Sequence, residues 1–586
     1  MVDPLLQRAS TRRQGNNNSG SFQKDDAGGG DRTRKGRSPR DFKSLAFANF
    51  ATPAASKDTP DYFSPMPVPR RSRLHLLAAA ACLLPTSLPA QLPPLSVPKG
   101  QLRFDIGGRF EFWDQTYSAG TKLDAGADFT RDPATGSWLP GLGRAEADLS
   151  RITGAESVTL SLGKTSTTLT ANAGVVELGA ALGLTSRITI FGRVPIVRVR
   201  VQPNLGFDSA GASAGFNPAD PLFGNAGGAA ATNGFISQLD GALIALDAQI
   251  ESGLYDANPA MRAEAVALLA RGTTLQSDLA SLLLGSTFLP IQGTPVATAL
   301  TQTIDSIRTR MGGLGTPISL TAVPALPTTA LPPTGFEDYL TRAGGPIAAD
   351  PLEPPIFTSI GDIEVGAGFA LLNGKPPIRG FAVRSVLQGM VRLPTGKVDA
   401  PGALFDLGTG EKQLDLQADL VTDLMGSRFG ARLAARYVYQ LPGQLERRVT
   451  PPDQPVALAA SLAAVERDPG EILEGSFEPY FMIARSFSIV AGVRHWRKAQ
   501  DKYSWAAGQE PLPDASLDLL AQDSKENATM LSLGLSLAHP GLHPDGRTGL
   551  PVDAIIRGQM LLGSTEGRVP ARQSVVFEMR VYGRIF

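Results

Sequence analysis

The sequence lacks long apolar runs, net charge and cysteine. No run of about 18 or more apolar residues occurs in the 586 residues, so we expect no membrane-spanning helix. Basic and acidic residues both number 55, which leaves no basic excess to meet nucleic-acid phosphates. The one cysteine, Cys82, excludes a disulfide framework. Strands of a transmembrane barrel stay possible, because their hydropathy signal is weak.

The front of the chain differs in composition from the rest. Residues 1–65 are polar and have no apolar period, so we expect them to be disordered. Residues 66–90 have a basic start, a short apolar segment and Ala90 at a small-residue end, which predicts a signal peptide and Sec export. Signal peptides occupy N-termini, so a start at Met66 would make residues 1–65 a mis-assigned extension. The sequence does not decide whether translation starts at Met1 or at Met66.

The stretch Gln573–Phe586 alternates between two kinds of side chain. Apolar and charged residues fall on opposite faces of a β-strand with a period of two, as in Phe577, Glu578, Met579, Arg580 and Val581. One face suits lipid and the other a wet interior, which is typical of a transmembrane barrel strand. Leu102–Trp113 alternates in the same way, and closure of a barrel pairs its first strand with its last. The aromatic residue Phe586 resembles the C-terminal signal that the barrel assembly machinery reads in bacterial outer-membrane proteins.

About twelve segments alternate in this manner, and most are near the length needed to cross a membrane. They are residues 102–113, 168–183, 188–202, 360–372, 381–393, 414–423, 429–440, 476–484, 488–498, 530–537, 552–561 and 573–586. Long and short connections alternate from the first to the tenth, as in bacterial barrels. We therefore predict an all-β fold, a transmembrane antiparallel β-barrel of about twelve strands, with strands 1–3 in residues 91–202 and strands 4–12 in residues 358–586.

The connection over residues 203–357 is too long for a simple loop. Helical spacing of apolar residues occurs in 236–251, 259–271, 275–284 and 298–311, between Gly-rich and Pro-rich flanks. We predict a helical subdomain inserted in an extracellular loop. The polar residues from 117 to about 156 are expected to form a long loop without helices.

The charged residues of the strands are expected to face the lumen, because a charge facing hydrocarbon is costly. The lumen-lining candidates are Arg103, Arg109, Glu111, Asp362, Glu364, Arg384, Arg392, Asp415, Asp419, Arg432, Arg436, Glu478, Arg494, Asp553, Arg557, Glu578 and Arg580. They could form rings of charge in a water-filled passage. Alternatively, they could fill a closed lumen with ion pairs that serve stability, and the sequence leaves both interpretations open.

Two groups of strand-end motifs carry a family resemblance. One is Gly361-Asp-Ile-Glu-Val-Gly-Ala-Gly with Leu393-Pro-Thr-Gly396 and Asp406-Leu-Gly-Thr-Gly410; the other is Leu182-Gly-Leu-Thr-Ser-Arg-Ile with Val194-Pro-Ile. Together they resemble outer-membrane barrels of the meta-pathway phenol-degradation type, which are related to the long-chain fatty-acid transporter group. The resemblance implies passive uptake of small hydrophobic or aromatic compounds. It assigns no substrate-binding residue.

We expect no enzymatic activity, cofactor or metal site. His539 and His543 are four residues apart, but Pro540 and Gly541 exclude a shared helix face. The string Gly211-Ala-Ser-Ala-Gly215 matches the sequence of a nucleophile elbow, which needs a strand directly before it and a helix directly after it. Here it lies in a Gly/Ala/Ser-rich flank, where such a string arises easily by chance.

The sequence therefore predicts a channel or transporter in the outer membrane of a diderm bacterium. Its expected partners are outer-membrane lipid, the assembly machinery and a small-molecule solute, with no nucleic acid. An alternative is an anchor that displays the helical subdomain as a binding or scaffolding module. A barrel with only a structural role in the envelope is also open.

Overall fold

The computed structural model describes residues 92, 94–314, 320–354, 356–374, 382–451, 454–484, 486–513, 515–539 and 551–585. The predictions for residues 1–65, for the signal peptide at 66–90 and for Phe586 lie outside these ranges.

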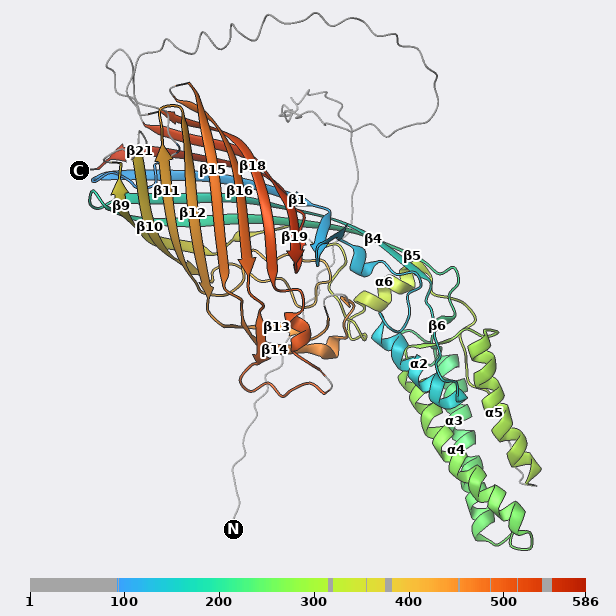
Figure 1. Ribbon diagram of the computed structural model, residues 1–586. Coiled ribbons are helices and arrows are strands. Elements are labelled where there is room, and N and C mark those ends of the chain that lie inside the picture. The colour runs from blue at the N-terminus through green and yellow to red at the C-terminus, as the bar shows by residue number, and fades with distance from the viewer. Residues whose placement is uncertain are drawn as a thin grey trace, which may run out of the picture. The chain divides into compact units, whose positions relative to one another are not determined.

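Twelve antiparallel strands close into a barrel, as predicted (Figure 1). Its closure is seen in β1 (Gln101–Trp113), which pairs with β21 (Gln573–Arg584) on one side and with β4 (Lys164–Gly183) on the other. The other strands, in order around the wall, are β5 (Ile188–Asp208), β9 (Ile363–Asn373), β10 (Ala382–Leu393), β11 (Asp415–Met425), β12 (Phe429–Gln440), β15 (Ile472–Ala484), β16 (Phe487–Lys498), β18 (Glu526–His539) and β19 (Val552–Glu566). Each contains or overlaps one of the predicted segments.

The barrel has two different rims. The end with the short connections, such as that between β4 and β5, is called the turn rim here, and β1 begins there beside the end of β21. The other end is called the loop rim. There, β8 (Phe357–Ile360) pairs with β5 directly before β9 does, so β8 and β9 form one strand with a break. The break is sealed, because the Gly361 N–H donates to the Pro195 carbonyl at 2.8 Å.

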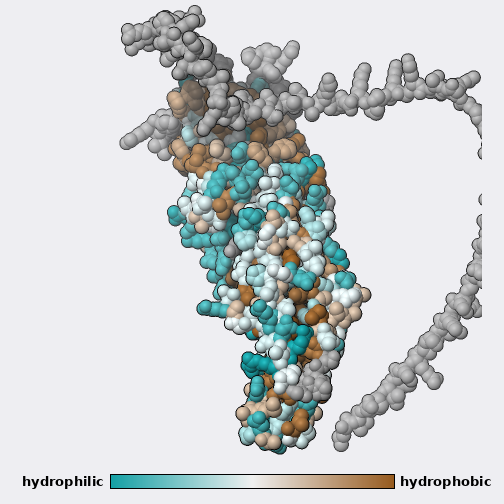
Figure 2. All heavy atoms as spheres, turned by 90° about the vertical axis from the view of Figure 1, so that its right-hand side faces the viewer, coloured by the Kyte–Doolittle hydropathy of each residue, from teal (hydrophilic) through white to brown (hydrophobic). Residues whose placement is uncertain are grey.

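The outer wall of the barrel is apolar and the inner wall is charged. Every barrel strand exposes at least one large apolar side chain, for example Phe110 at 63%, Leu533 at 64% and Leu387 at 47%. Exposure of such a continuous apolar surface to water is unfavourable, whereas lipid covers it at no cost. In Figure 2 brown side chains gather around the upper, barrel part, while teal and brown are interspersed on the helical part below. No helix among the described residues is long and apolar enough to cross a membrane.

Strands β4 and β5 continue beyond the barrel as a two-stranded ribbon (Figure 1). Their alternation inverts along the way: Val199 and Val201 are buried inward, whereas Arg198 and Arg200 point outward and are exposed. Thr189, which is buried, and Arg193, which is half-buried, face inward at the alternating positions nearer the start of β5. The outer surface therefore changes from apolar to charged near Ile196, which marks where the ribbon leaves the apolar band.

The insertion is helical, as predicted, and its helices are longer than predicted. It contains α3 (Ala226–Glu251), α4 (Pro259–Gly285), α5 (Pro295–Gly313) and α6 (Pro333–Thr341). The prediction of two helices in 259–284 was wrong, since α4 is continuous through Gly272. A Cβ at Gly272 would lie 2.5 Å from a methyl carbon of Leu243 on α3, so this glycine permits close packing rather than ending a helix.

The prediction of an uninterrupted loop over residues 117–156 was also wrong. This segment contains β2 (Gln115–Ser118, which begins before it), β3 (Thr121–Asp124), η1 (Ala127–Phe129) and α2 (Pro140–Thr153). Helix α2 packs its Leu142 and Leu149 into one core with Leu239 and Leu246 of α3. The helical bundle is therefore built from two separate connections, and its core continues to Trp113 and Val201 at the loop rim.

Short elements cover the loop rim. The connection after β12 contains β13 (Gly443–Arg448), η2 (Ala459–Ser461) and β14 (Leu462–Asp468). Strands β13 and β14 form a three-stranded sheet with β17 (Lys502–Trp505), which the sequence did not predict. The remaining elements are β6 (Ala214–Phe216), β7 (Phe288–Pro290), α7 (Asp518–Ala521) and β20 (Arg568–Pro570).

Candidate functional site: the barrel lumen

Two sizeable cavities lie inside the described part of the barrel, beside a small one of about 20 Å³ between β1, β4, β5 and β21. The first, here the inner cavity, has a volume of about 370 Å³ and is lined by residues of every barrel strand except β9. Only the interior of a closed barrel can touch so many strands at once. The second, here the rim cavity, has a volume of about 420 Å³ and lies toward the loop rim.

Most of the predicted lumen-lining residues line these cavities. Ten line the inner cavity: Arg103, Arg109, Asp419, Arg432, Arg436, Glu478, Arg494, Arg557, Glu578 and Arg580. Glu111, Arg392 and Asp415 line the rim cavity. Alternation along the strands was therefore enough to place these thirteen side chains on the inner wall.

Four predicted residues line neither cavity. Glu364 contacts Arg193 and Arg392, and Asp553 accepts a hydrogen bond from the Tyr582 hydroxyl at 2.7 Å. Arg384 stands opposite Asp423 in the pairing of β10 with β11.

Asp362, the fourth residue, has a structural role at the loop rim. It lies in the break between β8 and β9, and its carboxylate accepts backbone N–H bonds from Gly396 and Glu411. These bonds tie the break to the connection that follows β10, so Asp362 holds a loop in place rather than facing the lumen cavities.

Sequence reasoning omitted several lining residues. Glu177, Arg193 and Glu474 line the inner cavity as well. Glu474 was missed because the predicted strand began at residue 476, although Glu474, Ser476 and Glu478 share one alternation. Gln388 and Gln559 also line the inner cavity and were passed over because they carry no charge.

The charged side chains of the wall are organised into ion pairs. Arg432 contacts Asp423 at 2.7 Å and Arg436 contacts Asp419 at 2.8 Å, both between neighbouring strands. The Arg494–Glu474 pair, at 2.7 Å, joins β16 to β15. Because these pairs lie along the wall, they neutralise the charges without closing the lumen.

The segment before β1 enters the lumen at the turn rim. The Val97 N–H donates to Thr189 Oγ1 of β5 at 3.1 Å. Leu92, which is 2% exposed, packs against inward side chains of β15, β16 and β19, namely Tyr480, Met482, Val490 and Ile555. Since β16 lies opposite β5 in the ring of strands, Leu92 and residues 94–97 span the lumen and narrow it at this end.

A charged network orders the loop rim. Asp501 accepts from the Gly470 N–H at 3.0 Å and contacts Lys498 at 2.7 Å and Arg467 at 2.9 Å. Burial would raise the pKa of Asp501, but the charges of Lys498 and Arg467 outweigh burial and hold that pKa below its ordinary value of 3.8. The carboxylate is therefore charged at neutral pH and ties β14 to the end of β16.

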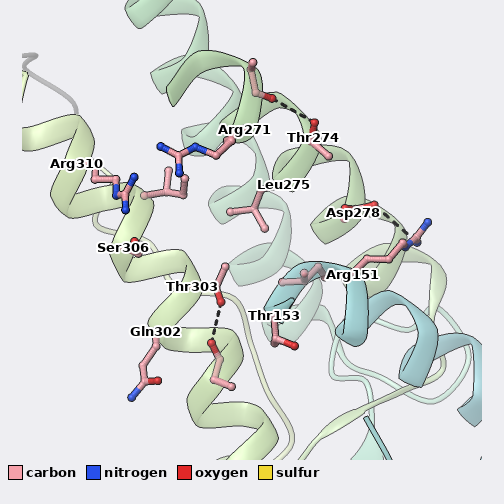
Figure 3. Close-up of a pocket in the computed structure, with 14 residues that line it drawn as sticks. Arg151, Thr153, Arg271, Thr274, Leu275, Asp278, Gln302, Thr303, Ser306 and Arg310 are labelled. Carbon is pink, nitrogen blue, oxygen red and sulfur yellow. Dashed lines mark hydrogen bonds and ion pairs between the residues drawn. The ribbon is translucent and has the colours of Figure 1, made fainter. Parts of the chain in front are cut away.

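A separate groove of about 690 Å³ lies on the helical bundle between α2, α4 and α5 (Figure 3). Figure 3 shows Arg271 of α4 and Arg310 of α5 approaching each other across it, and among the described residues neither has a carboxylate within ion-pair distance. Arg151 of α2, by contrast, contacts Asp148 and Asp278. In the described ranges no group of three or more His, Cys, Asp or Glu side chains is placed to hold a metal ion.

Comparison with known proteins gives similarity at the level of barrel architecture. No protein-family model and no curated protein sequence matches the chain. The COG4313 outer membrane channel from Pseudomonas putida F1 is similar with a TM-score of 0.38 and 9% identity, over 84% of this chain and 100% of that chain. The CymD monoaromatic hydrocarbon channel follows with a TM-score of 0.24 and 9% identity, over 84% and 89%. The transport unit of the autotransporter AIDA-I from Escherichia coli has a TM-score of 0.28 and 7% identity, over 84% and 93%. The assignment of a barrel here rests on the strand pairings of this chain.

Proposed function

We propose that this protein is an outer-membrane barrel for passive uptake of small solutes with a hydrophobic or aromatic body. The observation that carries the proposal is the pair of lumen cavities, which share six lining residues and so adjoin each other. Together they extend from the loop rim toward the segment before β1. An apolar outer wall and a hollow, polar inner wall are what a passage through lipid requires.

The proposed mechanism is diffusion down a concentration gradient. A solute enters at the loop rim, crosses the two cavities and leaves past Leu92 and residues 94–97, which must shift to let it through. That shift is local, because within the described part of the chain Leu92 packs against side chains of the wall and Val97 hydrogen-bonds to Thr189. No energy source is required for such a step.

Uptake by cells tests the proposal. Cells that display the chain in the outer membrane should accumulate a labelled monoaromatic solute faster than cells with empty vector. Equal accumulation in both, with the barrel shown to be folded and present, would contradict it.

The groove on the helical bundle favours a second candidate, a membrane anchor that displays a binding module. Arg271 and Arg310, which have no carboxylate partner among the described residues, lie on α4 and α5, away from the barrel lumen. Absence of uptake by the full chain, with a folded barrel, would favour the anchor, and removal of residues 206–351 then tests the role of the bundle. Uptake that survives the deletion supports a channel whose bundle has another role, whereas loss of uptake with a folded barrel ties the bundle to transport.

A further inference from the structure

We propose that the lumen selects anions and that the solute carries a carboxylate on its aromatic or short aliphatic body. This inference rests on the proposed function and names the substrate class for it. The evidence lies in six residues, here called the waist, that line both cavities: Arg109, Arg436, Glu474, Arg494, Met530 and Gln559. A solute that passes from one cavity to the other must pass them.

The waist carries three arginines and one glutamate. Its single carboxylate, Glu474, is used by Arg494 at 2.7 Å and lies 3.8 Å from Arg436. The other partners stand outside the waist: Asp419 holds Arg436, and Glu111 holds Arg109 at 3.2 Å. The count of charges at the waist is therefore positive.

The orientation of these ion pairs adds to the excess of positive charge at the waist. The side chains of Arg109, Arg436 and Arg494 are 38–44% exposed to the lumen, whereas those of Glu111, Asp419 and Glu474 are 11–12% exposed. The guanidinium groups are thus accessible from the lumen, whereas the carboxylates are buried against the barrel wall. A permeating solute meets the positive end of each pair first, and such rings of charge set the sign of the ions that pass.

The same orientation extends into the rim cavity. Arg392 is 35% exposed and its partner Asp415 only 5%. Three of the described pairs at the cavities have the opposite order, with the carboxylate more exposed than the arginine: Arg580–Glu578 and Arg103–Asp105 on the strands near the turn rim, and Arg467–Glu411 in the rim cavity, where Glu411 is 56% exposed. The positive surface is therefore located at the waist, on the path between the two cavities.

Apolar side chains stand beside these arginines. Val438, Ile472, Trp496 and Leu561 line the rim cavity, and the guanidinium of Arg494 lies 5.4 Å from the centre of the Trp496 ring. A flat or short apolar body can rest against this wall while its carboxylate meets Arg494 and Arg436. Guanidinium groups bind carboxylates well because the geometry of their donors matches. A neutral aromatic hydrocarbon could make a cation–π contact with the arginines, but it would lack the ion pair and the hydrogen bonds that a carboxylate makes.

The test is the relative permeability of benzoate and potassium. The chain is folded into planar bilayers with potassium benzoate at different concentrations on the two sides, and the sign and size of the reversal potential are read. Parallel recordings use a Leu92→Asp variant, in which the segment before β1 is displaced. We expect a reversal potential close to the equilibrium potential of benzoate, which means that benzoate carries most of the current.

Variants locate the selectivity at the waist. Arg494→Gln should lower the ratio of benzoate to potassium permeability roughly fivefold, as expected when a charge at about 4 Å is removed from a watery site. Arg494→Lys, which keeps the charge, should restore it. Arg200→Gln, on the outward face of β5, is the matched control and should leave the ratio unchanged.

The outcomes distinguish this inference from the proposed function. Anion selection would be overturned if the channel preferred potassium or showed no preference. It would also be overturned if neither the wild type nor the Leu92→Asp variant conducted any current. If cells still take up a labelled neutral aromatic in that case, passive uptake stands without the selectivity. If they take up neither, the proposed function fails as well.

Discussion

Arg557 Nη1 of β19 lies 2.7 Å from Glu478 Oε1 of β15, and the strands β16 and β18 stand between them in the wall. The pair therefore crosses part of the lumen instead of following the wall. Both side chains are less than one-fifth exposed. Both residues line the inner cavity, so their contact limits its width.

Removal of one partner of this pair should destabilise the barrel. Glu478→Gln leaves the Arg557 charge largely buried and unpaired, and breaking a buried pair in this way typically costs about 3–5 kcal/mol. Partial exposure places the expected loss at the lower end. The free energy of unfolding in urea measures it.

The double variant Glu478→Gln/Arg557→Gln is the control for the pair. It should recover part of the loss, because no unpaired charge remains. Losses that simply add would show that the two side chains do not interact in the folded barrel.

Displacement of the segment before β1 should widen the turn end of the lumen. Leu92→Asp places a charge among Tyr480, Met482 and Val490, so the segment should leave its site. We expect larger single-channel conductance than in the wild type. Lys99→Asp, an exposed position in the same segment, should conduct like the wild type; identical currents from both variants would show that the segment does not limit passage.

The loop-rim sheet should loosen in acid. The pKa of Asp501 is depressed in the folded protein, so its contribution to stability is full above the ordinary value of 3.8 and disappears as pH falls through the folded pKa. Hydrogen exchange of β14 and β17 should therefore be slower in the wild type than in Asp501→Asn at pH 7. The difference should shrink below about pH 4, and a difference that grows in acid would contradict this assignment.

Helix α2 should be needed for the stability of α3 and α4, although it belongs to another connection. Leu149 is fully buried in the shared core, so Leu149→Ala should cost about 2–5 kcal/mol. Proteolysis of the α3–α4 hairpin should accelerate accordingly. Ile244→Ala, at an exposed position of α3, is the matched control and should change little.

The barrel could be predicted because its strands obey a simple rule. Alternation with a period of two places Phe577 outward and Glu578 inward regardless of distant contacts. The pairing of β1 with β21 followed from closure alone. The rule failed at Val199 and Arg198, where the ribbon extends beyond the apolar band. There the inward positions hold valines and the outward positions hold arginines.

The parts outside the barrel depend on contacts that alternation does not encode. Gly141 and Gly143 obscured α2, although Leu142, Leu149 and Ile152 have helical spacing. Its place in the core depends on Leu239 and Leu246, about one hundred residues away. Likewise, no local pattern predicts that Leu92 crosses the lumen, because its apolar partners lie on three strands near the other end of the chain.

Labelling of a single cysteine at the waist tests most directly whether the lumen is the passage. In a Cys82→Ser background, Met530→Cys places a thiol at the waist, whereas Leu533→Cys, three residues on in β18, places one on the outer wall. A bulky thiol reagent should abolish uptake through the Met530→Cys protein and leave uptake through the Leu533→Cys protein unchanged. Full uptake after complete labelling at position 530 would contradict passage through the lumen.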